Sequence, residues 1–252
     1  MQAMIFAAGL GTRLKPLTDD RPKALVTLNG VPLIDYVIDR LRTAGVRHIV
    51  VNVHHFADML CEHLSQKAYN DLTISVSDER RLLLDTGGGV RQALQYVDTS
   101  QPLLIHNVDI VSNSSLTDFI KKAQQLHCQS GCEAALMVRR RTSSRYLLFD
   151  EQMQMRGWTN TKTGEVRPQT LCKTLSEQPF SQYAFSGIHL LFPEIYPLLQ
   201  SYPERFGITD FYVQTCQQHR YVGIDMPNDT IIDVGKPETL AEAERQLQKL
   251  SY

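Results

Sequence analysis

Short apolar segments typical of buried strands alternate with amphipathic segments typical of helices throughout the first half of the chain. The expected strands cover residues 3–7, 48–53, 72–77 and 103–106. The expected helices cover residues 33–44, 56–64, 90–97 and 116–127. Gly45 follows the first helix as a C-terminal cap. This order predicts an α/β fold with a mostly parallel sheet and helices on both faces.

The alternation weakens from about residue 134. Further strands are expected at 134–138, 145–149, 183–191, 221–225 and 230–234. Further helices are expected at 193–199, 211–219 and 237–250. The polar stretch 152–181 is expected to form hairpins or a long loop. Because no repeat, low-complexity tract or clear linker interrupts the chain, we expect one domain whose second half extends the same sheet.

The composition argues against several classes of partner. The chain has 252 residues and a net charge of −1, which gives no support for binding to nucleic acid or to a membrane surface. It contains no apolar run long enough for a transmembrane helix. Five scattered cysteines indicate reduced thiols, and the N-terminus lacks the pattern of a signal peptide, so a cytoplasmic protein is expected.

The first expected strand runs into a loop that is both glycine-rich and cationic, "AAGLGTRLKPLTDDRPKAL". Gly9 and Gly11 allow backbone N–H groups to approach phosphate oxygens closely, while Arg13 and Lys23 supply positive charge. The spacing fits neither the dinucleotide fingerprint nor a Walker loop. The loop therefore predicts a small polyanion, a triphosphate, in a crevice that exposes both Arg13 and Lys23. The competing interpretation is a sharp turn with solvated charges.

A second glycine-rich stretch, "LLLDTGGG", covers residues 82–89. Three successive glycines between a strand and a helix would leave the backbone open to a flat ring. The N-terminus of the following helix could also face an anion. The competing interpretation is a flexible turn that begins the helix.

Two carboxylates follow apolar strands. Asp109 comes at the end of "LLIHNVD", and Asp233 comes at the end of "TIID". Ligands of open parallel sheets bind at the carboxyl ends of strands, and Mg²⁺ prefers one or two carboxylates together with substrate phosphates. The two residues therefore predict a shared Mg²⁺ site, although each is also compatible with a capping role.

Together with "YAFSGIHL" at 183–190 and "DVGKPE" at 233–238, these stretches resemble the signatures of the sugar-1-phosphate nucleotidyltransferases, in that family's order. The resemblance spans about residues 1–244. It implies a Rossmann-like fold without the C-terminal β-helix of larger relatives. It also implies Mg²⁺-dependent joining of an NTP to a sugar 1-phosphate, with release of pyrophosphate. The single domain 1–252 would then comprise a nucleotide-binding half, 1–133, and a sugar-phosphate-binding half, 134–252.

The resemblance also implies site residues. The nucleotide phosphates would be held by Ala8, Gly9, Leu10, Gly11, Thr12 and Arg13. The catalytic cations would be Arg13 and Lys23, and the metal ligands Asp109 and Asp233. The base pocket would be lined by Asp78, Gly87 and Gly88. The sugar phosphate would contact Asn107, Gly187 and Lys162, the last in place of a glutamate–lysine pair that many relatives carry.

The sequence "LDTGGG" resembles the compact N-acetylmuramate-1-phosphate uridylyltransferases, which implies UTP as the nucleotide and a role in cell-wall recycling. Asp78 argues in the other direction, because a carboxylate could accept from an amino group of guanine or cytosine and uracil has none. Guanylyl transfer to a mannose or heptose 1-phosphate therefore stays open. Thymidylyl transfer to glucose 1-phosphate is a further alternative, which Asp78 does not favour. Val108 stands where the family usually has glycine, beside the expected metal site.

Two other classes of protein are less compatible with this sequence. A glycosyltransferase that consumes a nucleotide sugar commonly needs a D-x-D motif, and position 107 is Asn. A non-catalytic nucleotide-sensing module would have no need to retain Arg13, Lys23, Asp109 and Asp233 together. The sequence sets no oligomeric state, and a monomer or a small homo-oligomer is compatible with it.

Overall fold

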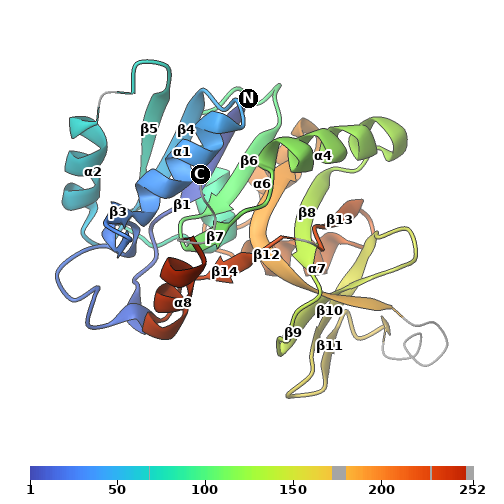
Figure 1. Ribbon diagram of the computed structural model, residues 1–252. Helices are drawn as coiled ribbons and strands as arrows, with labels where there is room; N and C mark the ends of the chain where they lie inside the picture. The colour runs from blue at the N-terminus through green and yellow to red at the C-terminus, as the bar shows by residue number, and fades with distance from the viewer. Residues whose placement is uncertain (68, 172–179, 228, 248–252) are drawn as a thin grey trace.

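The computed structural model describes residues 1–67, 69–171, 180–227 and 229–247 (Figure 1). Its centre is a sheet of ten strands. The strands of the first half lie in the order β6-β1-β4-β5 and are all parallel. Their bounds are β1 Gln2–Phe6, β4 His48–Val53, β5 Thr73–Asp78 and β6 Leu103–Asn107. The alternation of strands and helices in the sequence therefore folds as expected.

Helices cover both faces of this sheet. One face packs against α1, α2 and α4, while the other packs against α3, α6 and α7. The strand residues divide in the same way, since Ile5 joins the first core and Met4 joins the second. The bounds are α1 Leu33–Thr43, α2 Ala57–Gln66, α3 Asp85–Ala93, α4 Leu116–Ser130, α6 Tyr196–Ser201 and α7 Ile208–Thr215.

The second half extends the sheet with mainly antiparallel strands. The long strand β12 pairs antiparallel with β6, β8 and β9, while β13 returns parallel to β8. The hairpins β9–β10 and β10–β11 project from this edge (Figure 1). The bounds are β8 Ala134–Arg139, β9 Arg145–Phe149, β10 Met155–Asn160, β11 Glu165–Arg167, β12 Ser181–Leu191 and β13 Tyr221–Asp225. The expected Rossmann-like fold is confirmed, with its parallel strands concentrated in the first half.

The end of the chain returns to the first half. Strand β14, Ile231–Asp233, pairs antiparallel with β7, Ile110–Ser112. Helix α8, Pro237–Leu247, follows and lies beside the N-terminal half (Figure 1). Its Glu244 accepts hydrogen bonds from Asn29, in the turn between β2, Thr27–Leu28, and β3, Val31–Pro32. This return brings Asp233 beside residues that follow β6.

Some predicted boundaries were wrong. Helix α3 begins at Asp85 and not at Val90, so the three glycines lie inside its first turns. Helix α7 begins and ends earlier than expected. Short 3₁₀ helices, which were not predicted, cover Thr12–Leu14 and Lys23–Leu25. The helix expected at 193–199 begins as a 3₁₀ turn, Pro193–Ile195, and continues as α6. The stretch 152–181 contains β10 and β11 as hairpin strands, while residues 172–179 lie outside the described residues.

Within the described part of the chain, no helix is both long and apolar enough to span a membrane. The four cysteines in that part, Cys61, Cys128, Cys132 and Cys216, are free, as expected of reduced thiols. The fifth, Cys172, lies outside it.

Candidate active site

A cavity of about 360 Å³ opens where the parallel strands reach their carboxyl ends, and we call it the strand-end cavity. Residues at the ends of four strands, β1, β4, β5 and β6, line it together with residues of the connecting segments. The lining residues are Phe6, Ala7, Ala8, Gly9, Lys23, Asn52, Glu79, Leu83, Asp85, Thr86, Asn107, Val108, Asp109 and Arg205. The position agrees with the binding site expected for an open parallel sheet.

The two glycines of the cationic loop have different roles. Gly9 lines the strand-end cavity, and the space beside it is open, so its backbone is accessible to a ligand. Gly11 has φ +66°, and a side chain there would lie 2.9 Å from the Thr18 methyl group. The Thr18 hydroxyl donates to the Gly11 carbonyl at 2.9 Å and closes the turn. Gly11, Leu10 and Thr12 are absent from the residues that line the cavity, so any contact they make with phosphate stays a prediction.

Lys23 donates from Nζ to Oδ2 of Asp109, which brings the loop cation onto the strand-end carboxylate. Both groups line the cavity, but the Lys23 residue is only 9% exposed. The expectation that Lys23 stands exposed in a crevice is therefore wrong, because Asp109 partners the ammonium at the inner wall. Arg13, by contrast, is exposed, as predicted.

Asp109 and Asp233, far apart in the sequence, are neighbours in the structure. The Val234 N–H donates to the Asp109 carbonyl at 2.9 Å, and Asp233 pairs with Ile110 across the β7–β14 ribbon. The Asp233 carboxylate accepts from the Gly235 N–H at 2.9 Å. A side chain at Gly235 would lie 2.7 Å from Asp233 Oδ1 and 2.9 Å from Arg13 Nη2. Two carboxylates and the loop arginine thus gather around one short ribbon.

A second cavity, of about 720 Å³, has Asp233 of this ribbon and Arg13 in its wall, and we call it the arginine cavity. Four arginines line it: Arg13, Arg141, Arg145 and Arg167. The remaining wall includes Trp158 and Asp233. Sequence reasoning missed the three arginines of the second half, although the run Arg139–Arg140–Arg141 was a visible signal.

Lys162 is not among the residues that line the arginine cavity. It lies in the turn between β10 and β11, where its N–H donates to Asn160 Oδ1 at 3.0 Å. The structure therefore gives no support to Lys162 as a sugar-phosphate ligand. The cationic side chains that do line this cavity are arginines.

Asn107 and Gly187, both predicted to border the sugar, do lie together. Gly187 has φ +72° at an irregularity in β12, and a side chain there would lie 2.6 Å from Asn107 Nδ2. The glycine is needed for both its backbone angle and its lack of a side chain. It leaves room for the Asn107 amide at the wall of the strand-end cavity.

The prediction that Asp78 lines the base pocket finds no support. Its carboxylate is held by Arg80 Nε at 2.8 Å, and the hydrogen bond from Arg80 lowers the pKa of Asp78. Asp78 is also absent from the residues that line the strand-end cavity. Glu79, its neighbour, lines the cavity instead, because successive side chains at a strand end point in opposite directions.

Gly87 and Gly88 lie in the first turns of α3 and not in an open loop. Their N–H groups donate to the Phe206 carbonyl at 2.8 and 3.2 Å. Side chains at these positions would collide with the Phe206 ring and the Glu204 carbonyl. The expectation that this helix N-terminus faces an anion is therefore wrong, because the segment around Phe206 uses its amides. Asp85 and Thr86, just before them, line the strand-end cavity.

A buried polar network that the sequence did not reveal supports the strand-end cavity. Asn52 Oδ1 accepts from the N–H groups of Ala7 and Ala8 at 2.7 and 3.2 Å. Asn52 Nδ2 donates to Glu79 Oε1 at 2.7 Å, and Glu79 Oε2 accepts from the Leu84 N–H at 3.1 Å. Burial raises the pKa of the Glu79 carboxyl, whose residue is 2% exposed. This network joins the start of the phosphate loop to the segment before α3.

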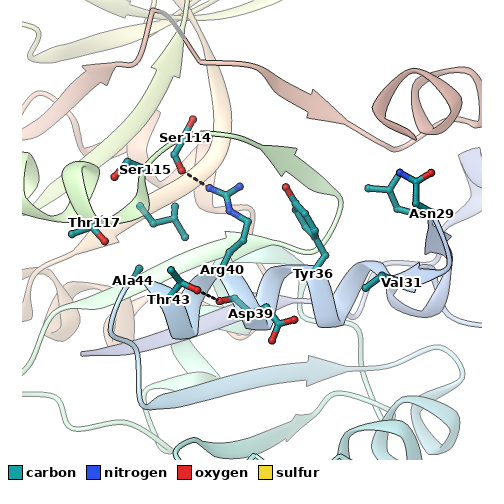
Figure 2. A pocket seen from close by; sticks show the side chains of 12 residues that line it. Asn29, Val31, Tyr36, Asp39, Arg40, Thr43, Ala44, Ser114, Ser115 and Thr117 are labelled. Carbon is teal, nitrogen blue, oxygen red and sulfur yellow. Dashed lines mark hydrogen bonds between the residues drawn. The ribbon is translucent and has the colours of Figure 1, made fainter. Parts of the chain in front are cut away.

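A third cavity, of about 670 Å³, lies between α1 and the start of α4 (Figure 2). No predicted site residue lines it. From α1, Arg40 donates to Ser112 Oγ at 2.6 Å, and Tyr36 donates to the Ser112 carbonyl at 3.0 Å. These bonds fix the backbone that follows β7, so Arg40 and Tyr36 serve the scaffold of the site.

Comparison with known proteins agrees with this geometry. The family described as "Nucleotidyl transferase" matches residues 2–249. The chain is 32% identical over 250 residues to N-acetylmuramate alpha-1-phosphate uridylyltransferase of Caulobacter vibrioides, covering 97% of this chain and 96% of that protein. It is 26% identical to UTP–glucose-1-phosphate uridylyltransferase AglF of Haloferax volcanii, covering 99% and 97%.

Solved structures share the fold. A putative glucose-1-phosphate thymidylyltransferase from Bacillus anthracis superposes with a TM-score of 0.79 at 14% identity. The superposition covers 100% of this chain and 97% of that one. At this identity the likeness establishes the architecture alone.

Proposed function

This chain belongs to the nucleotidyl transferase family, as a sugar-1-phosphate nucleotidyltransferase, and we propose that it transfers a uridylyl group from UTP to N-acetylmuramate 1-phosphate. The products would be UDP-N-acetylmuramate and pyrophosphate. The observation that carries the choice of substrates is the similarity, over nearly the whole length of both chains, to a uridylyltransferase of that specificity. We further propose that the reaction takes place in the cytoplasm as a step of cell-wall recycling.

The proposed reaction requires no general base from the protein. An oxygen of the sugar phosphate is already an anion and attacks the α-phosphorus of UTP. A new P–O bond forms while the bond to the β-phosphate breaks, and the electron pair leaves with pyrophosphate. The chain's contribution is therefore to position two anions and to offset their charge. Arg13, which lines the arginine cavity with Asp233, and Lys23, which is bonded to Asp109, are suited to that task.

Asp109 and Asp233 are the residues that would hold Mg²⁺. Their carboxylates are hard oxygen donors from directly adjacent backbone, which fits this ion. Among the described residues, no group of three or more His, Cys, Asp or Glu side chains could hold a metal. The protein would thus contribute two carboxylates and leave the remaining positions to phosphates and water, as Mg²⁺ prefers. When bound, the ion would offset charge on the phosphate oxygens.

The structure weakens the objection to UTP. Asp78 argued for a base with an amino group, but its carboxylate is held by Arg80. Leu83, Asp85 and Thr86 line the strand-end cavity, and this segment would contact the base through backbone groups and Thr86. A pocket of this kind selects among bases by rejecting those that leave its polar groups unpaired.

A competition experiment tests this proposal. Equal concentrations of UTP, GTP, CTP and dTTP are supplied with N-acetylmuramate 1-phosphate, N-acetylglucosamine 1-phosphate, glucose 1-phosphate or mannose 1-phosphate, and products are resolved by mass. UDP-N-acetylmuramate should dominate. A clear preference for GTP, or for dTTP with glucose 1-phosphate, would contradict the proposed substrates and leave the reaction class intact.

A further inference from the structure

We propose that Arg141 and Arg145 form a subsite for a carboxylate carried by the sugar phosphate, separate from the residues that hold the phosphate itself. The inference rests on the proposed function, because N-acetylmuramate differs from N-acetylglucosamine by a lactyl ether that ends in a carboxylate. It assigns recognition of that group to the β8–β9 loop, which carries Arg141, and to Arg145, the first residue of β9.

The arginines of the arginine cavity are not equivalent. Arg167 already pairs with Glu165 at 2.6 Å and with Asp210 at 3.2 Å, and it lies over the Trp158 ring at 5.0 Å from the centroid. Arg141 and Arg145 are exposed, and neither side chain has an ion pair or a hydrogen bond to any described residue. These two guanidinium groups line the cavity with their hydrogen-bonding capacity available to a ligand.

Arg13 belongs to the other end of the cavity. Its guanidinium and the Asp233 carboxylate both flank Gly235, next to the ribbon that carries Asp109. The phosphate of the sugar must lie at this end, because it attacks a nucleotide held in the strand-end cavity. Apart from the ion-paired Arg167, the cavity therefore carries cations at two places. One is Arg13 of the phosphate loop, and the other is Arg141 and Arg145, between the end of β8 and the start of β9. A substrate whose only anionic group is its phosphate would need only the cation at the Arg13 end.

The backbone that carries Arg141 and Arg145 is held in place. The Tyr146 hydroxyl accepts from the Ser143 N–H at 2.8 Å and donates to the Arg141 carbonyl at 3.2 Å. Ser143 Oγ donates to the Arg145 carbonyl at 3.0 Å. The Thr161 N–H donates to the Ser144 carbonyl at 2.9 Å, which fastens the loop to the next hairpin. A loop ordered before binding loses less entropy when it engages a ligand.

Arginine is also the side chain suited to this ligand. Its planar guanidinium matches a carboxylate with two parallel hydrogen bonds, and such charge-assisted bonds are stronger than neutral ones. Two arginines whose backbones are joined through Ser143 and Tyr146 can share one carboxylate. The subsite would favour a carboxylated sugar over the same sugar without that group.

The test compares two sugars that differ by the lactyl group. With saturating UTP, kcat/KM is measured for N-acetylmuramate 1-phosphate and for N-acetylglucosamine 1-phosphate, and their ratio is taken. In Arg141→Gln and Arg145→Gln this ratio should fall by about 10- to 100-fold, the worth of a charge-assisted hydrogen bond. Arg145→Lys keeps the charge but loses the paired geometry, so its ratio should lie between those of Arg145→Gln and the wild type.

Lys121→Gln is the matched control, because it removes one positive charge from the exposed surface of α4, away from all cavity walls described above. Its ratio should stay within about twofold of the wild type. Thermal unfolding of each variant shows whether the fold is kept, which is expected because Arg141 and Arg145 are exposed.

The outcomes separate this inference from the proposed function. If the wild type prefers N-acetylmuramate 1-phosphate and both glutamine variants keep the full preference, the subsite is wrong and the proposed function stands. If the wild type does not use N-acetylmuramate 1-phosphate, the proposed function fails and the subsite fails with it.

Discussion

The two main cavities differ in how their polar groups are satisfied. In the strand-end cavity, Lys23 partners Asp109, while Asn52 and Glu79 are bonded to each other and to the backbone. In the arginine cavity, Arg141 and Arg145 have no partner among the described residues. The first arrangement fixes a geometry that any nucleotidyl transfer needs. Under the proposed function, the second arrangement leaves two arginines to recognise the sugar, while the transfer itself takes place at the strand-end cavity and the β7–β14 ribbon.

The largest effect is expected at Lys23. Lys23→Ala removes a cation that we propose to lie beside the reacting phosphates, so kcat should fall by on the order of 10²–10³ with either sugar. Because Lys23 is buried against Asp109, the substitution also leaves a carboxylate without its partner. Turnover is measured by pyrophosphate release, and Lys23→Arg, which keeps the charge, separates catalysis from folding. Full turnover by a folded Lys23→Ala protein would contradict the catalytic role proposed for the strand-end cavity.

The next largest effect is expected at the carboxylates of Asp109 and Asp233. Asp109→Asn and Asp233→Asn should each raise the Mg²⁺ concentration needed for half-maximal rate, by roughly 10-fold or more, since each removes one of the two proposed charged ligands. EDTA should abolish activity. Titration of Mg²⁺ against rate checks this, and an unchanged requirement in both variants would show that the ribbon does not hold the ion.

Glu79 tests whether the buried network serves the nucleotide. Glu79→Gln replaces one acceptor oxygen with a donor that faces either Asn52 Nδ2 or the Leu84 N–H, so unfolding should become easier by about 1–3 kcal/mol. KM for UTP should rise several-fold, with little change in the preference between sugars. Denaturant unfolding and steady-state kinetics measure the two effects. A changed sugar preference with an unchanged KM for UTP would contradict the assignment.

The same residue predicts a pH dependence of stability. Burial raises the folded-state pKa of Glu79 above its ordinary value of 4.5, so the protonated form is favoured in the folded chain. The contribution of Glu79 to folding stability is fully present at pH values below its ordinary pKa of 4.5. It is lost as the pH rises through the raised pKa of the folded state. The free energy of unfolding of the wild type, relative to Glu79→Gln, should therefore decrease across that interval. A difference that rises with pH would mean that the hydrogen bonds outweigh burial.

The smallest effect is expected at Lys162. The sequence suggested a sugar-phosphate ligand there, but the residue lies in a hairpin turn away from the cavity wall. Lys162→Ala should change kcat/KM for both sugars by less than about twofold, as for an exposed surface charge. A loss as large as that of Arg145→Gln would return Lys162 to the site and weaken the role given to the arginines.

The sequence predicts features that depend on neighbouring residues better than features that depend on contacts between distant residues. Strand ends and the glycine loop are local patterns, so the positions of Gly9, Asp109 and Asp233 were predictable. The choice between Asp78 and Glu79 depends on one residue of register at the end of β5, which sequence periodicity does not resolve. The role of the α3 glycines depends on contact with Phe206, more than a hundred residues away, and no local signal encodes it.

Pyrophosphate release is the most direct measurement of the central claim. The wild-type protein is supplied with UTP and Mg²⁺, and with either N-acetylmuramate 1-phosphate or N-acetylglucosamine 1-phosphate. Release should depend on Mg²⁺ and on the sugar phosphate, and should be faster with N-acetylmuramate 1-phosphate at limiting concentration. Equal or faster release with N-acetylglucosamine 1-phosphate would contradict the assignment of sugar recognition to the arginine cavity, and no release with any sugar 1-phosphate would contradict the activity itself.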